Sequence, residues 1–133
     1  MEKDLQINKL DLDLESLKTP AIYGKYLKYL NQAILTLKKL ESDEKVMIRE
    51  KWEYYSGKSD PDIYKEKPFD LKVLKSDVPM YIDSDSDMIV IRDKIAYARQ
   101  IANYLTEVIK GISNRNWNIK NAIEWRKFTS GIA

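Results

Sequence analysis

The feature that most constrains this chain is a run of apolar residues at helical spacing in its first third. Five of them recur at steps of four and three residues: Tyr23, Leu27, Leu30, Ile34 and Leu37. On a helix this spacing gathers the side chains into one heptad-like stripe, which is typical of a helix packed lengthwise against another helix. The run therefore predicts a long helix with a helical partner.

The predicted helix covers residues 20–57. Thr19 is a suitable N-cap and Pro20 a suitable first helical residue. Gly57 is a suitable terminator, because glycine readily adopts the left-handed conformation that closes many helices. The apolar pattern weakens around Ser42, so the sequence leaves open whether one helix or two span this region.

A second helical region is predicted over residues 86–131. Asp85, Ser86 or Asp87 can open it, because their short side chains accept hydrogen bonds from the first free amides of a helix. Its apolar positions again recur at helical spacing: Ile91, Ile95, Ala98, Ala102, Leu105 and Ile109. Gly111 marks a point at which this helix can bend or end.

The segment between these helices, residues 58–85, is acidic and rich in loop signals. Near residues 78–83 a short extended or β stretch is expected, because Pro79 excludes a continuing helix while valine, tyrosine and isoleucine favour strands. A short amphipathic helix is expected at residues 2–8. With 44% hydrophobic residues, residues 1–133 correspond to a single, mainly all-α domain of long helices around a loop-rich acidic middle.

The residue types that carry most catalysis and cofactor binding are missing from this sequence. It contains no cysteine and no histidine, which removes the common zinc ligands, cysteine nucleophiles and histidine bases. Asp83, Asp85 and Asp87 imitate the start of a calcium loop, but Met88 and Lys94 stand where that loop needs glycine and glutamate. No glycine-rich phosphate loop occurs. We therefore expect no enzyme activity, no cofactor and no metal.

Charge is distributed unevenly along the chain, although the formal net charge is only +2. Residues 21–58 carry eight basic and five acidic side chains (+3), residues 59–93 five and nine (−4), and residues 94–133 seven and two (+5). Two basic regions thus flank the acidic middle. Such clusters can bind nucleic acid or simply solvate helix faces, and the distribution of charge alone leaves both open. No export signal or membrane span is recognisable, so a cytoplasmic protein without a membrane partner is expected.

The strongest binding signal lies in residues 45–58, where cations alternate with aromatic rings. On a helix, Lys51, Tyr55 and Lys58 would share one stripe and Lys45, Arg49 and Trp52 a neighbouring one. Cations neutralise phosphates and aromatic rings stack on unpaired bases, so this combination is typical of single-stranded DNA binding. The alternative is that Trp52, Tyr54 and Tyr55 are core residues.

The run E-Y-Y-S-G-K, preceded by the basic pair Arg49-x-Lys51, resembles the most characteristic motif of the UvsY-type recombination mediators of T-even-like bacteriophages. The resemblance continues more weakly through Ile119, Ile123 and Phe128. It implies that Arg49 and Lys51, and Lys58 after the glycine, bind single-stranded DNA. From the pattern of cations and rings, Lys45, Tyr54 and Tyr55 are further candidates for the DNA-binding site. The resemblance also implies a hexameric or heptameric ring of helical subunits that acts in the host cell and helps a RecA-like recombinase replace the single-strand-binding protein.

The C-terminal residues 112–128 are predicted to form the principal assembly element. They carry more apolar surface than one helix face of a small subunit can bury, through five side chains: Trp117, Ile119, Ile123, Trp125 and Phe128. The alternative is an ordinary terminal helix folded onto its own subunit. Two other functions stay open, namely a helical scaffold that ignores DNA and a carboxylate-dependent nuclease.

Overall fold

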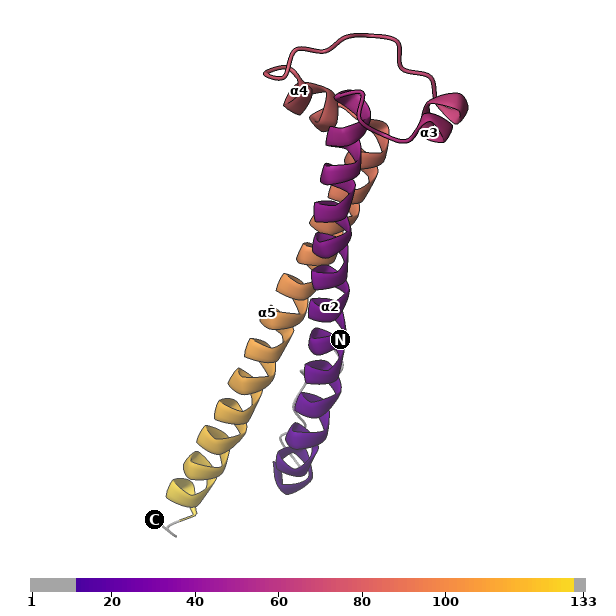
Figure 1. Cartoon of the computed structure of the whole chain (residues 1–133). Coiled ribbons are helices and arrows are strands. Elements are labelled where there is room, and N and C mark those ends of the chain that lie inside the picture. The colour runs from indigo at the N-terminus through magenta and orange to yellow at the C-terminus, as the bar shows by residue number, and fades with distance from the viewer. Residues whose placement is uncertain (1–11, 131–133) are drawn as a thin grey trace. The chain divides into compact units, whose positions relative to one another are not determined.

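The structure is a computed structural model that describes residues 12–130, with side chains described from Lys18 onward. Its helices are α2 (Leu12–Tyr55), α3 (Pro61–Glu66), α4 (Val78–Asp83) and α5 (Ser86–Thr129) (Figure 1). No strand occurs among residues 12–130, so the predicted mainly all-α fold is confirmed. The helix expected at residues 2–8 lies outside the described residues.

Contacts divide the chain into two compact units. The first joins the described residues up to Ile34 with those from Gln100 onward, and the second comprises Leu35–Arg99. Both long helices contribute to both units. Each unit therefore contains a part of α2 packed against a part of α5.

Helix α2 is longer at its N-terminal end than predicted. It begins at Leu12 and contains Pro20, so the prediction that Thr19 caps a helix starting at Pro20 is wrong. A proline inside a helix removes one backbone hydrogen bond and costs about 3 kcal/mol. The Thr19 hydroxyl accepts a hydrogen bond of 2.6 Å from Arg115 Nη1, a tertiary contact on this turn that local sequence signals do not reveal. The helix runs without interruption through Ser42.

The core of the first unit overlaps the predicted apolar stripe of α2 only in part. Tyr26 is buried with Leu105, Val108 and Ile112 of α5, and partly buried residues pack around them: Ile22, Leu30, Ala33 and Ile109. Tyr23 and Ile34 of the predicted stripe are exposed instead. Both registers have helical spacing, so periodicity alone could not decide which stripe meets the partner helix.

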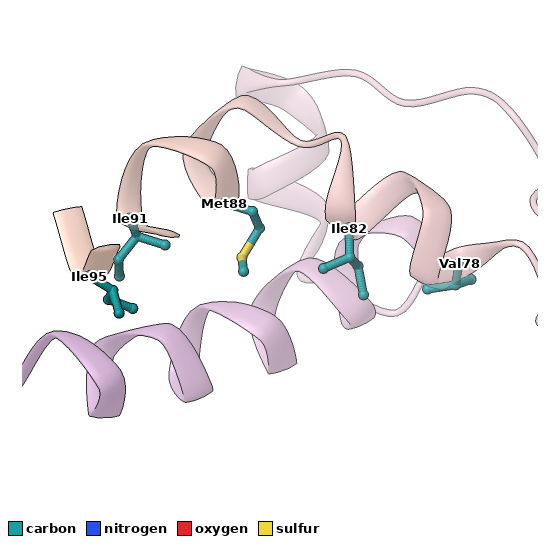
Figure 2. Close-up of a cluster of buried hydrophobic side chains, with 5 residues drawn as sticks. All are labelled: Val78, Ile82, Met88, Ile91 and Ile95. Carbon is teal, nitrogen blue, oxygen red and sulfur yellow. The ribbon is translucent and has the colours of Figure 1, made fainter. Parts of the chain in front are cut away.

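The core of the second unit is formed by five buried side chains from α4 and α5: Val78, Ile82, Met88, Ile91 and Ile95. Figure 2 shows Met88, Ile91 and Ile95 pointing toward α2. Partly buried residues of α2, including Leu40, Ile48 and Trp52, pack against this cluster. The C-terminal turns of α2 are thus fixed between α4 and the start of α5.

Residues 78–83 form helix α4, so the β stretch expected there is wrong. Pro79 occupies the first turn of this helix, where a missing amide costs nothing because that amide has no partner within the helix. Val78 and Ile82 are four residues apart and both are buried. Burial of this pair favours a helix over the strand that their local propensity suggests.

Helix α5 matches its predicted pattern closely. Five of the six predicted apolar positions are buried and Ile109 is partly buried. The helix passes through Gly111 without ending. Of the three N-cap candidates, Asp85 takes the position, because its Oδ1 accepts hydrogen bonds from the amides of Asp87 (2.9 Å) and Met88 (3.2 Å).

Candidate nucleic-acid interface

The Y-Y-S-G-K motif forms the C-terminal cap of α2. The Lys58 amide donates to the carbonyl of Glu53 (2.8 Å) and the Gly57 amide to that of Tyr54 (3.2 Å). Gly57 has a φ of 75°, so these bonds make a Schellman motif with glycine in its left-handed position. The glycine of the motif therefore ends the helix as predicted, and it directs the chain that follows.

Lys51 and Tyr55 both reach Asp85 at the start of α5. Tyr55 Oη donates to Asp85 Oδ2 at 2.6 Å, and Lys51 Nζ lies 3.3 Å from the same oxygen. Lys51 Nζ also donates to Asp87 Oδ2 at 2.7 Å. The Asp85 carboxylate thus caps α5 with one oxygen and holds the end of α2 with the other.

These contacts change the pKa values of the three groups. Burial alone would raise the pKa of Asp85, but hydrogen bonds from Tyr55 and the Met88 amide, with the charge of Lys51, lower it below its ordinary value of 3.8. Burial alone would lower the pKa of Lys51, yet Asp87 and Asp85 raise it above 10.5. The pKa of Tyr55 is raised by burial and by Asp85. Lys51 and Asp85 are therefore a charged pair at neutral pH.

Tyr54 belongs to a cluster of aromatic rings beside the motif. Its ring stacks on Tyr64, with centroids 5.3 Å apart, and lies 5.5 Å from Phe69. Its hydroxyl donates to the carbonyl of Lys67 at 2.9 Å. Tyr55 contacts Phe69 and Tyr81 in the same cluster. Both tyrosine rings are engaged within the unit, as the core interpretation expects.

The other predicted DNA-binding cations are exposed on α2 or just beyond its end. Lys45 is exposed, and the Arg49 side chain is 68% exposed with only a 4.0 Å approach to Glu53. Lys58 Nζ lies 4.5 Å from the centroid of the Trp52 ring, a cation–π contact. Lys45, Arg49 and Trp52 follow one another at helical steps of four and three residues, and Lys58 lies over Trp52. We refer to the three cations Lys45, Arg49 and Lys58 as the basic strip.

The structure therefore groups the six predicted DNA-binding residues differently from the expected stripes. Lys58 follows the end of the helix and lies over Trp52, away from the stripe of Lys51 and Tyr55. The basic strip holds Lys45, Arg49 and Lys58, while Lys51, Tyr54 and Tyr55 are bound inside the second unit. The sequence identifies Asp85 as an N-cap candidate, but no local signal shows that its second carboxylate oxygen holds Lys51 and Tyr55.

The five predicted assembly residues also separate into two kinds. Ile119 is 1% exposed and Ile123 is partly buried, so both pack within the first unit. Trp117, Trp125 and Phe128 are 60%, 67% and 69% exposed. The rings of Trp125 and Phe128 stack with centroids 5.8 Å apart, and together they leave a large aromatic surface uncovered in a single subunit.

None of the helices that the structure describes has a stretch long and apolar enough to span a bilayer. Within the same residues, no group of three or more potential ligands is arranged to hold a metal ion. A long-helix protein with exposed cations beside an aromatic ring has the features of a helical nucleic-acid-binding protein.

Comparison with known proteins narrows this class to one family. The family model described as "Recombination, repair and ssDNA binding protein UvsY" matches residues 1–132. The chain therefore belongs to the UvsY family, whose role lies in recombination, repair and the binding of single-stranded DNA.

The similarity extends over nearly the whole chain. The recombination protein uvsY of Enterobacteria phage T4 is 22% identical over 131 residues, which cover 98% of this chain and 93% of the relative. Two crystal structures of the T4 recombination mediator protein UvsY superpose with TM-scores of 0.84 at 22% identity. They cover 97% and 96% of this chain and 91% and 94% of theirs. These structures establish the shared fold.

Proposed function

We propose that this chain is a phage recombination mediator that binds single-stranded DNA as a homo-oligomer. In this role it promotes loading of a RecA-like recombinase in place of the single-strand-binding protein. The observation that carries the proposal is the basic strip on the exposed side of α2. The T4 relative is a recombination mediator protein, which supports the finer role.

The basic strip is proposed to contact the phosphates. Lys45 lies ten residues before Tyr55, the last residue of α2, which corresponds to about 15 Å along the helix. Arg49 and Lys58 are spaced within and just beyond that length. Their cations are accessible without breaking any strong ion pair, so they can exchange solvent for phosphate oxygens at little cost.

Lys51, Tyr54 and Tyr55 are proposed to act on DNA binding indirectly. Lys51 and Tyr55 tie the end of α2 to Asp85, and Tyr54 packs in the aromatic cluster. Freeing Lys51 for a phosphate would leave the buried carboxylate of Asp85 poorly compensated. These three residues therefore position the turn that presents Lys58.

Assembly supplies the affinity that one subunit lacks. Three cations neutralise only a few phosphates, so a lone subunit should bind weakly and with a strong salt dependence. Several copies that engage one strand multiply the affinity through effective concentration. Exposed Trp117, Trp125 and Phe128 are proposed as the side chains that a second copy covers, because such aromatic surfaces are enriched at protein interfaces.

The strip can be tested by replacing Lys45 and Arg49 together with alanine. The matched control replaces Lys94 and Lys110, two exposed lysines of α5. Anisotropy of a labelled oligothymidylate should show roughly tenfold weaker binding for the first variant, and the slope of log K against log salt should fall by about 1.4, or 0.7 per lost contact. The control should behave like wild type.

If both variants bound the oligonucleotide equally well, the basic strip would not be the surface that contacts DNA. If wild-type protein formed no complex at any salt concentration, the chain would instead be a helical scaffold that ignores DNA. Loading can be followed through the ATPase activity of the phage recombinase on single strands covered beforehand with the single-strand-binding protein. Wild type should shorten the lag before activity, and the Lys45/Arg49 variant should do so less.

A further inference from the structure

A small groove in the second unit brings together residues from two distant segments of the chain. Its volume is about 210 Å³, and it is lined by Trp52, Ser56, Lys58, Val73, Lys75 and Val78. Lys75 lies between α3 and α4, 17 residues beyond Lys58, within residues 59–93, whose net charge is −4. The fold thus brings a cation from the acidic middle to the end of the basic strip.

The charge of this groove is unbalanced. Two lysines and no carboxylate line it among the described residues, and none of the ion pairs found there involves Lys58 or Lys75. The larger groove of the same unit has the opposite character, because two lysines, Lys51 and Lys67, are outnumbered there by five carboxylates: Glu50, Glu53, Glu66, Asp85 and Asp87. An anion is therefore attracted to the smaller groove and repelled from the larger one.

The surroundings of the two lysines also suit an anion. Val78 is buried and Trp52 is half-buried, so the floor is apolar and strengthens the attraction between opposite charges above it. Ser56 adds a hydroxyl donor. A helix C-terminus normally disfavours anions, but here the carbonyls of Glu53 and Tyr54 are already occupied by the amides of the Schellman turn.

We infer that Ser56, Lys58 and Lys75 form a phosphate-binding site that takes one phosphodiester group of single-stranded DNA. The inference rests on the proposed function and extends the basic strip by one contact, from a segment whose overall charge is negative. Lys75 is the new DNA-binding residue, and Trp52 supplies the floor and holds Lys58 in place.

The test compares Lys75→Ala with Lys72→Ala, which removes an equal charge from the same segment but outside the groove. With a labelled oligothymidylate, Lys75→Ala should weaken binding about threefold or more and lower the salt slope by about 0.7. Lys72→Ala should stay within about twofold of wild type. Circular dichroism should show unchanged helix content for both, since both side chains are exposed.

A double-mutant cycle with Lys58→Ala tests whether the two lysines share one phosphate. If they do, the loss in the double variant should be smaller than the product of the two single losses. Independent effects would overturn the shared site. Equal binding by the Lys75 and Lys72 variants would also overturn it, while a continued defect of the Lys45/Arg49 variant would leave the proposed function standing.

The source of the anion is distinguished by competition. Inorganic phosphate and chloride at matched ionic strength should displace the oligonucleotide equally from wild type, because the site takes a phosphate that the strand holds in place. Displacement by inorganic phosphate alone, abolished by Lys75→Ala, would reassign the site to a free phosphate. If Lys75→Ala instead weakened only the binding of polyglutamate, the partner would be an acidic peptide and the inference wrong.

Discussion

Replacement of Asp85 by alanine should be among the most destabilising changes of a polar residue in this protein. The carboxylate is 8% exposed, caps α5 through two amides and accepts the hydroxyl of Tyr55. Loss of the cap costs about 1 kcal/mol, and a half-buried Tyr55 hydroxyl without its acceptor about 1 to 2 kcal/mol. Lys51 still pairs with Asp87 at 2.7 Å, so only part of the stabilisation from its ion pairs is lost.

The total is roughly 3 kcal/mol, which for a chain of this length lowers the melting temperature by about 10 °C. Urea unfolding followed by circular dichroism measures it. Asp85→Asn should lose about 2 kcal/mol, because the asparagine carbonyl oxygen keeps the cap, whereas its NH2 group cannot accept the hydrogen bond from the Tyr55 hydroxyl. Asp83→Ala is the matched control. Its carboxylate is 67% exposed and pairs with Arg92, so its loss should cost about 0.5 kcal/mol or less.

If Asp85→Ala and Asp83→Ala unfold at the same urea concentration, the stabilising role of Asp85 is refuted. It is also refuted if Asp85→Asn unfolds at as low a urea concentration as Asp85→Ala, because the cap would then contribute nothing. DNA affinity measured well below the melting temperature separates stability from binding. It should fall only modestly in Asp85→Ala, since the phosphate-binding cations remain.

The remaining predictions concern pH, the aromatic cluster and assembly. The stabilisation from Asp85, whose pKa is lowered, is present above pH 3.8 and lost as the pH falls through its folded pKa. The stabilisation from Lys51, whose pKa is raised, is present below pH 10.5 and lost as the pH rises through its folded pKa. Urea unfolding across pH should therefore show a smaller loss of stability in acid for Asp85→Asn than for wild type. Tyr54→Leu should lower the free energy of unfolding by about 1 to 2 kcal/mol and leave DNA affinity of the folded protein nearly unchanged, whereas loss of affinity alone would indicate base stacking. Replacing Trp125 and Phe128 by serine should reduce the oligomeric size in light scattering while helix content persists, and an unchanged size would exclude these rings as the assembly contact.

Point substitutions test assembly better than a truncation does, because some of the C-terminal residues are buried in the first unit. Cutting the chain after Gly111 would remove Ile112 and Ile119, which are buried in the first unit. Such a truncation would unfold this unit whether or not the segment mediates assembly. Exposed Trp125 and Phe128 can be changed without that loss.

Much of the fold follows from the sequence because the signals concerned are local. The apolar positions of α5 lie on one stripe, Gly57 ends α2, and Asp85 stands among the predicted N-caps, since spacing and backbone preference act within a few residues. The Y-Y-S-G-K motif with its basic pair likewise pointed to the family. These features need no knowledge of what the helices pack against.

Other features of the candidate site depend on tertiary contacts. Arg49 and Lys51 are two residues apart, about 200° around a helix, so they cannot serve the same face, and only the position of Asp85 shows which of them is tied down. Pro79 argues against a continuing helix at residues 78–83 until Val78 and Ile82 are seen buried on one helix face.

Sequence by itself determined the helical class, the ends of the main helices on either side of the acidic middle and the presence of a basic, aromatic motif, because those depend on neighbours along the chain. The tertiary structure alone decided that Tyr26 rather than Tyr23 faces α5. It also decided that Lys51 forms an ion pair with Asp87 within the second unit and that Lys75 and Lys58 line the same groove. The physical reason is that each of these outcomes depends on a partner many residues away in the chain, whose position is set by packing of the whole unit.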